Sequence, residues 1–284
     1  MKLYRDFATQ DELDREYNAG AAVPDSAARM AHWTERSVRA RETLAARLDV
    51  PYGPTRAEYL DIFPAGEGAP VHLFVHGGYW RRFTARDFSF VAEQLVAAGT
   101  AAVVVNYALC PAVTIGEIVR QVRAAIAWTW SNAASFGGAR DDLTVSGHSA
   151  GGHLVAMALC TEWPGDYDLP ADTIKAGLGI SGLYDLAPFP YTWLQPSLQL
   201  TWGEVRRCSP INAVPDSAPP FTAVVGGAES AEFHRQARDF LARWHEHGLP
   251  GSLEVVEGPN HFTVLDTLAE RPGGLAADLR SQVR

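Results

Sequence analysis

The chain of 284 residues carries a formal net charge of −9 at pH 7, and its 47% of hydrophobic residues suffices for a sizeable core. The negative charge argues against nucleic acid or an anionic membrane surface as a partner, because both attract basic patches. No segment approaches the ~18 consecutive apolar residues of a membrane span, and the opening MKLYRDF lacks the apolar centre of a signal peptide. The chain has three cysteines and no CxxC pair, which fits a reducing cytoplasm. We expect all three to be small buried hydrophobic residues: Cys110, Cys160 and Cys208. We therefore expect a cytoplasmic globular protein whose partner is a small molecule, and a homodimer is compatible with the sequence.

The first part of the chain predicts two polar helices, residues 11–17 and 25–48, the second with Asp25 or Ser26 as its N-cap. These helices precede every predicted strand. We expect residues 1–50 to form an N-terminal helical extension, packed near the mouth of a site or serving as plain scaffold.

After the PYGP turn at residues 51–54, apolar runs alternate with amphipathic segments. This alternation predicts a mostly parallel central sheet with helices on both faces, in a single domain spanning residues 1–284. The strands are expected near residues 57–62, 71–75, 101–105, 143–146, 176–180, 221–225 and 252–256, and the helices near 87–98, 115–134, 151–161 and 232–247.

A proline-rich stretch at about residues 187–220 interrupts the alternation and contains Trp193 and Trp202. Such a segment is either an irregular cap over a pocket or an ordinary long surface connection.

The most informative motif is GHSAGG at residues 147–152, which follows the apolar run Leu143–Val145 and precedes a helical stretch. A serine between glycines at a strand-to-helix turn is typical of a nucleophile elbow, in which the strained backbone exposes the hydroxyl at the edge of the sheet. The sequence therefore identifies Ser149 as the candidate nucleophile.

An HGGYW segment at residues 76–80 follows another buried strand. Glycines there let backbone N–H groups approach a developing negative charge. We expect the N–H groups of Gly77 or Gly78 to form an oxyanion hole with that of Ala150, the residue after the serine.

The candidate base is His261, in a loop after the last predicted strand, where the histidine of a Ser…acid…His chain order belongs. The candidate acid is Glu229, at the end of the preceding strand and 32 residues earlier. Glu232, one turn into the next helix, and Asp185, after the strand at residues 176–180, are its rivals.

These motifs resemble those of the α/β-hydrolases of the kynurenine formamidase (arylformamidase) type. The matching segments are HGGYW at 76–80, GHSAG at 147–151, ESAEFHRQ at 229–236 and His261-Phe262, and the connecting loops at 106–111 and 181–186 agree with them. The YW after HGG separates this group from the lipase-like esterases, whose loop is usually HGGG. The resemblance covers about residues 55–270 and implies the α/β-hydrolase fold with the Ser149, His261 and Glu229 triad. The family carries Asp where this chain has Glu229, so the chain departs from the pattern at the acid.

The implied reaction is acyl transfer to Ser149 with His261 as base, followed by hydrolysis of the acyl-enzyme. It requires no metal and no cofactor, and the sequence contains neither HExxH nor a phosphate-binding glycine loop. An aromatic wall of Tyr79, Trp80 and Phe262 favours hydrolysis of an arylformamide such as N-formylkynurenine. We count His148, inside the elbow, among the substrate-binding candidates. The alternatives are a carboxylesterase or other small-amide hydrolase of a degradative pathway, and a ligand-binding hydrolase-fold protein without turnover.

Overall fold

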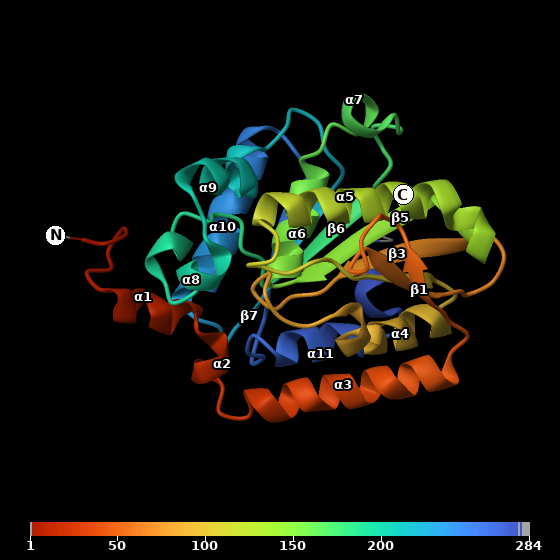
Figure 1. Ribbon diagram of the computed structural model, residues 1–284, viewed down its shortest axis with the longest axis horizontal. Helices are drawn as coiled ribbons and strands as arrows, with labels where there is room; N and C mark the ends of the chain where they lie inside the picture. Colours follow the sequence, from red (N-terminus) through yellow and green to blue (C-terminus); the bar gives the residue numbers. More distant parts are fainter. Residues whose placement is uncertain (1, 278, 280–284) are drawn as a thin grey trace.

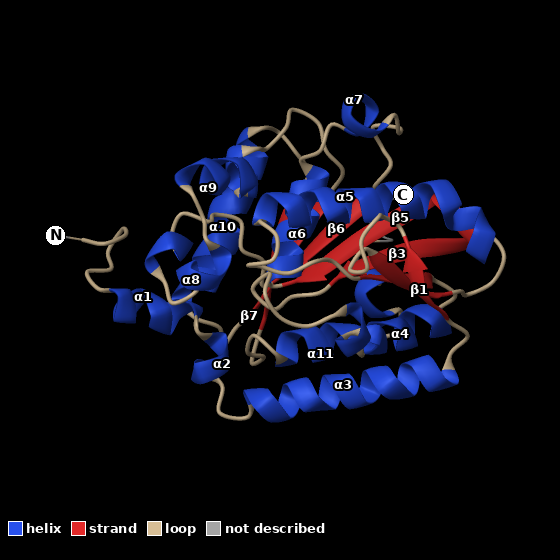
Figure 2. Ribbon diagram, in the orientation of Figure 1, coloured by secondary structure: helices blue, strands red, loops and turns tan. Residues whose placement is uncertain are grey.

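The fold is built on a twisted sheet of eight strands in the order β1-β2-β4-β3-β5-β6-β7-β8 (Figure 2). The computed structural model describes residues 2–277 and 279; residues 1, 278 and 280–284, which the predicted single domain includes, lie outside the described residues. The strands are β1 (Arg47–Pro51), β2 (Tyr59–Phe63), β3 (Ala69–Val75), β4 (Ala101–Val105), β5 (Gly138–His148), β6 (Ala176–Ile180), β7 (Phe221–Gly226) and β8 (Gly251–Val256).

The sheet is mostly parallel, as expected. Strand β2 pairs antiparallel with β1 and β4, and every pairing from β4 to β8 is parallel. The central strands β4 and β6 are buried at every position. Helices cover both faces, so these strands are continuous apolar runs without alternation.

Helices lie on both sides of the sheet, with α4 and α11 on one face and α5, α6 and α10 on the other (Figure 1). Four of the parallel crossovers carry a helix that packs on the sheet, and the fifth, between β6 and β7, contains only short helical pieces. The α-helices on the sheet are α4 (Ala92–Ala97), α5 (Ile115–Asn132), α6 (Ala150–Leu159), α10 (Ala231–Glu246) and α11 (Thr263–Ala269). The short α7 (Trp163–Tyr167) follows α6 and lies away from the sheet (Figure 1).

The N-terminal extension consists of α1 (Gln10–Tyr17), α2 (Ala19–Ala22) and α3 (Ser26–Thr43). Helix α3 forms an outer layer below α4 and α11 (Figure 1). The Trp33 indole on α3 donates to Asp266 on α11 over 2.5 Å, and Arg36 pairs with Glu93 and Glu270. These contacts attach the extension to the helical layer.

Residues 187–220 fold into short helical pieces that lie beside α1, at the end of the sheet where the parallel strands finish (Figure 1). Their α-helices are α8 (Gln195–Leu198) and α9 (Trp202–Cys208). The backbone N–H of Trp193 donates to Asp14 of α1 over 3.0 Å, so this segment and the N-terminal extension are joined.

The structure differs from the sequence expectation in several elements. Strand β1 falls where the second polar helix was expected to end; it is a mostly exposed edge strand of five residues, RLDVP, whose alternation is too short to stand out from the helix before it. Helix α4 begins at Ala92 rather than near residue 87, because a capping box between Thr84 and Asp87 closes a 3₁₀ turn first. Helix α11 and the short helices α2 and α7 were not predicted, and β5 begins at Gly138 rather than near residue 143.

No helix in the described part of the chain combines the length and apolar character that crossing a bilayer requires.

Candidate active site

Ser149 lies at the tight turn between β5 and α6. Its backbone has φ 57° and ψ −117°, a conformation that is costly for a residue with a side chain. The Ser149 N–H donates to the carbonyl of Ile180 over 2.7 Å, which fixes the turn to the end of β6. A Cβ on Gly151 would come within 2.0 Å of the Val75 carbonyl oxygen, so only glycine allows α6 to approach β3 this closely. The surrounding sheet therefore maintains the strained serine.

His261 and Glu229 meet at the same edge of the sheet. Glu229 follows β7, His261 follows β8, and the His261 Nδ1 lies 2.6 Å from the Glu229 Oε2. The Glu229 side chain is completely buried, and its Oε1 accepts hydrogen bonds from the Ser181 hydroxyl and the Gly226 N–H. With Nδ1 as the donor to this carboxylate, the Nε2 of His261 carries the lone pair.

The two rival acids make other contacts. Glu232 pairs with Arg235 and accepts a hydrogen bond from the Tyr17 hydroxyl. Asp185 accepts hydrogen bonds from the Tyr4 hydroxyl and the Ala187 N–H. Of the three carboxylates considered from the sequence, Glu229 is the one hydrogen-bonded to His261.

The HGGYW loop passes next to Ser149. A Cβ on Gly77 would lie 3.1 Å from the Ser149 Cβ and 2.7 Å from the His148 carbonyl oxygen, so glycine is required for this approach. In the described chain, the N–H groups of Gly77 and Gly78 donate to no protein acceptor. Ala150 is the first residue of α6, and its N–H has no partner within the helix. Free donors of this kind are what an oxyanion hole requires.

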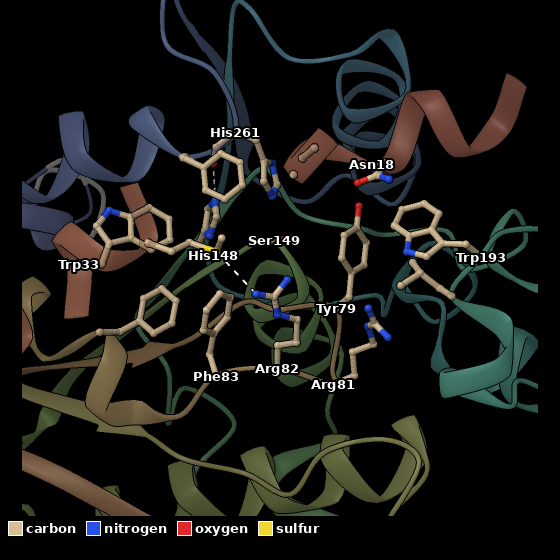
Figure 3. Close-up of a pocket in the computed structure, with 17 residues that line it drawn as sticks. Asn18, Trp33, Tyr79, Arg81, Arg82, Phe83, His148, Ser149, Trp193 and His261 are labelled. Carbon is tan, nitrogen blue, oxygen red and sulfur yellow. Dashed lines mark hydrogen bonds between the residues drawn. The ribbon is translucent and has the colours of Figure 1, made fainter. Parts of the chain in front are cut away.

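Ser149 and His261 line one cavity of about 160 Å³ (Figure 3). Its wall comes from the N-terminal extension, the loop after β3, the elbow, the 187–220 segment and the start of α11: Asn18, Ala19, Gly20, Met30, Trp33, Gly78, Tyr79, Arg81, Arg82, Phe83, Phe88, His148, Ser149, Trp193, Leu194, His261 and Phe262.

The predicted substrate-binding residues separate into two groups. Tyr79, His148 and Phe262 line the cavity, whereas Trp80 does not. Trp80 is completely buried, and its indole N–H donates to the His153 Nδ1 over 3.1 Å. The expectation for Trp80 is therefore corrected: Trp80 anchors the loop to the core from the side away from the cavity.

His148 supports His261 from the elbow. The His148 Nε2 lies 2.8 Å from the carbonyl oxygen of His261, and the two ring centroids are 4.7 Å apart. Burial lowers the pKa of His148 well below its ordinary value, so the ring is neutral and its Nε2–H donates. This contact orients the backbone that carries His261.

Several residues of the site have no local sequence signal. Ser181 holds the carboxylate of Glu229, and Trp33, Arg81 and Arg82 line the cavity, yet none was singled out from the sequence. Trp33 reaches the cavity only through the packing of α3. The loop glycines at 77 and 78 were the one available hint that the next residues would lie beside the serine.

Among the described residues, no three His, Cys, Asp or Glu side chains are grouped to hold a metal ion. The two histidines of the HxxxH spacing have separate partners: His72 contacts Thr144 and Ser146, and His76 contacts the Gly77 carbonyl. Independence from metal and cofactor stays a prediction.

Replacing Glu229 by glutamine tests the acid. We expect E229Q to lower kcat by about 10²–10⁴-fold, because an amide cannot stabilise the imidazolium that forms during acylation. D185N is the matched control, and it should lower kcat much less than E229Q when the two variants have equal thermal stability. A larger loss in D185N than in E229Q would show that Glu229 is the wrong acid.

The stability of the protein should depend on pH through the buried His153, which accepts a hydrogen bond from Trp80. Burial lowers the pKa of His153 to about 4, so between about pH 6.5 and 4 the unfolded chain binds a proton that the folded protein does not. The free energy of unfolding should fall as pH drops through this window, by up to about 1.4 kcal/mol per pH unit for this histidine.

Glutamine at position 153 can accept from Trp80 and donate to the Cys208 carbonyl without titrating. In urea unfolding at about pH 7 and pH 5, H153Q should therefore lose less stability with acid than the wild type. Equal losses in the two proteins would contradict this role of His153.

Comparison with known proteins agrees with the geometry. Residues 60–243 match the family described as BD-FAE. The chain is 30% identical to the kynurenine formamidase of Salmo salar, over 95% of each chain, and 30% identical to esterase LipC of Mycobacterium tuberculosis, over 92% of this chain and 69% of that protein. The crystal structure of a provisionally assigned thioesterase from Silicibacter sp. tm1040 superposes with a TM-score of 0.80 at 29% identity, over 96% of this chain and 98% of that one. The chain therefore belongs to the BD-FAE family and is an α/β-hydrolase enzyme related to the kynurenine formamidases.

Proposed function

We propose that this hydrolase cleaves small aryl amides or esters through an acyl-enzyme on Ser149, and that an arylformamide is its preferred kind of substrate. The observation that carries the proposal is the 2.6 Å contact between the buried Glu229 and His261, which lines the same cavity as Ser149. We assign the three side chains as nucleophile, base and acid of one triad.

In this mechanism the His261 Nε2 removes the proton of Ser149 as its hydroxyl oxygen attacks the substrate carbonyl. The N–H groups of Gly77, Gly78 and Ala150 would stabilise the oxyanion. His261 then donates its proton to the leaving amine or alcohol, and the same histidine activates the water that releases the acid. Glu229 keeps its charge and stabilises the imidazolium at each step.

The preference for an arylformamide is supported by the size and lining of the cavity. A volume of about 160 Å³ leaves little room for a long acyl chain, and Trp33, Tyr79, Trp193 and Phe262 offer aromatic surface to a leaving-group ring. The similarity to kynurenine formamidases of Salmo salar and Danio rerio, at 30% and 29% identity, favours the same substrate class. The similarity to esterase LipC favours carboxylester hydrolysis as the second candidate.

We propose the cytoplasm as its location, on the ground that Cys110, Cys160 and Cys208 are all free.

A substrate series on the purified protein tests the function. We expect N-formylkynurenine and aryl acetates to be cleaved well and aryl esters of about eight acyl carbons poorly, because each methylene left unburied forfeits about 0.8 kcal/mol. The S149A variant, assayed in parallel, removes any contribution from contaminating esterases. An optimum at butyrate or beyond, without detectable deformylation, would favour the carboxylesterase over the arylformamidase.

A further inference from the structure

Two arginines stand in the cavity directly after the oxyanion loop. Arg81 and Arg82 both line the wall that contains Ser149, and Figure 3 shows the Arg82 guanidinium pointing toward the cavity from the loop below Ser149. A Cβ on Gly78 would lie 2.4 Å from the Arg82 carbonyl oxygen, so the loop folds tightly back on itself. This fold keeps Arg82 close to the donors proposed for the oxyanion.

The charges around these arginines are unbalanced. None of the 17 residues that line the cavity is Asp or Glu, although the whole chain has a net charge of −9. His148 in the same wall is neutral because burial lowers its pKa. The lining of the cavity therefore carries two arginines and no carboxylate of its own, and the buried Glu229 behind His261 is hydrogen-bonded to that histidine.

Neither guanidinium has a carboxylate partner within 4.0 Å in the part of the chain that the structure describes. Arg81 donates to the Ser197 hydroxyl over 3.0 Å, and the Arg82 Nη2 lies 4.0 Å from the sulfur of Met30, a weak acceptor. Arg81 is half-buried and Arg82 is exposed. The buried Arg36 and Arg235, in contrast, each pair with carboxylates. Most donors of the Arg82 fork remain available to a ligand.

We propose that the substrate of this hydrolase carries a carboxylate on its leaving group and that Arg82, assisted by Arg81, binds it. The inference rests on the proposed function and specifies the substrate class of the same site. A planar guanidinium matches a carboxylate through two parallel charge-assisted hydrogen bonds, which are stronger than hydrogen bonds between neutral groups. Arg82 is thus a specificity residue: it selects anionic aryl amides over neutral ones.

The test compares a charged and a neutral formanilide in wild-type and variant enzymes. The probes are the 2-, 3- and 4-formamidobenzoates and unsubstituted formanilide, and the readout is the ratio of kcat/KM for the best benzoate to that for formanilide. Comparing this ratio between variants cancels the difference in intrinsic reactivity of the leaving groups.

We expect R82Q to lower the ratio by about tenfold, mainly through KM, because one charge-assisted contact at an exposed side chain is lost. The ratio for R82K should lie between those of the wild type and R82Q, because lysine keeps the positive charge but lacks the paired N–H donors of a guanidinium. R86Q is the matched control: Arg86 is four residues away, pairs with Asp49 outside the cavity, and should leave the ratio unchanged. Added salt should lower the wild-type ratio more than that of R82Q.

An unchanged ratio in R82Q would overturn the proposal. In particular, equal losses on both kinds of substrate would mean that Arg82 stacks on the leaving-group ring rather than binding a carboxylate. The S149A variant separates this failure from that of the proposed function: residual turnover of both probes by S149A would overturn the serine mechanism, whereas an inactive S149A with an unchanged R82Q ratio would overturn the carboxylate site alone.

Discussion

The site depends on one buried interaction, the hydrogen bond between His261 and Glu229. A carboxylate without exposure to water is tolerated only when its oxygens are hydrogen-bonded, and here Ser181, Gly226 and His261 supply the donors. These donors come from the ends of β6, β7 and β8, so the parallel sheet itself gathers them at one edge. The strained Ser149 lies at the same edge, fixed to the end of β6, which gives the reacting groups a common rigid support.

The cavity over this edge is completed by segments far from it in the sequence. Tyr17, at the end of α1, hydrogen-bonds to Glu232 and Gln236 on α10, and Arg235 pairs with Glu232 beside it. Tyr79 of the oxyanion loop donates to the Tyr17 carbonyl. The N-terminal extension is therefore tied by a buried polar network both to the helix behind the acid and to the loop beside the serine. Breaking one partner of such a network is costly, which keeps the cavity wall in one arrangement.

The sequence predicted those site residues whose role depends on their immediate neighbours in the chain. Ser149 and Gly77 are recognisable because a strand-to-helix turn and a close backbone approach each demand glycines in fixed places. The antiparallel edge strand β1 was not predicted because its five mostly exposed residues closely follow a polar helix and resemble its end. Trp33 was not predicted because only the packing of α3 brings it to the cavity. Trp80 was misplaced for a related reason: neighbouring residues of an irregular loop point in different directions, and Tyr79 faces the cavity while Trp80 is buried against His153.

The most direct test of the account is to label the nucleophile covalently with an aryl phosphonate and to locate the label by peptide mass mapping. One phosphonyl group per chain is expected on Ser149, because in the proposed triad this is the hydroxyl that the His261 and Glu229 pair activates. S149A should remain unlabelled under the same conditions. A label on another residue, or full labelling of S149A, would contradict the central claim that Ser149 is the nucleophile.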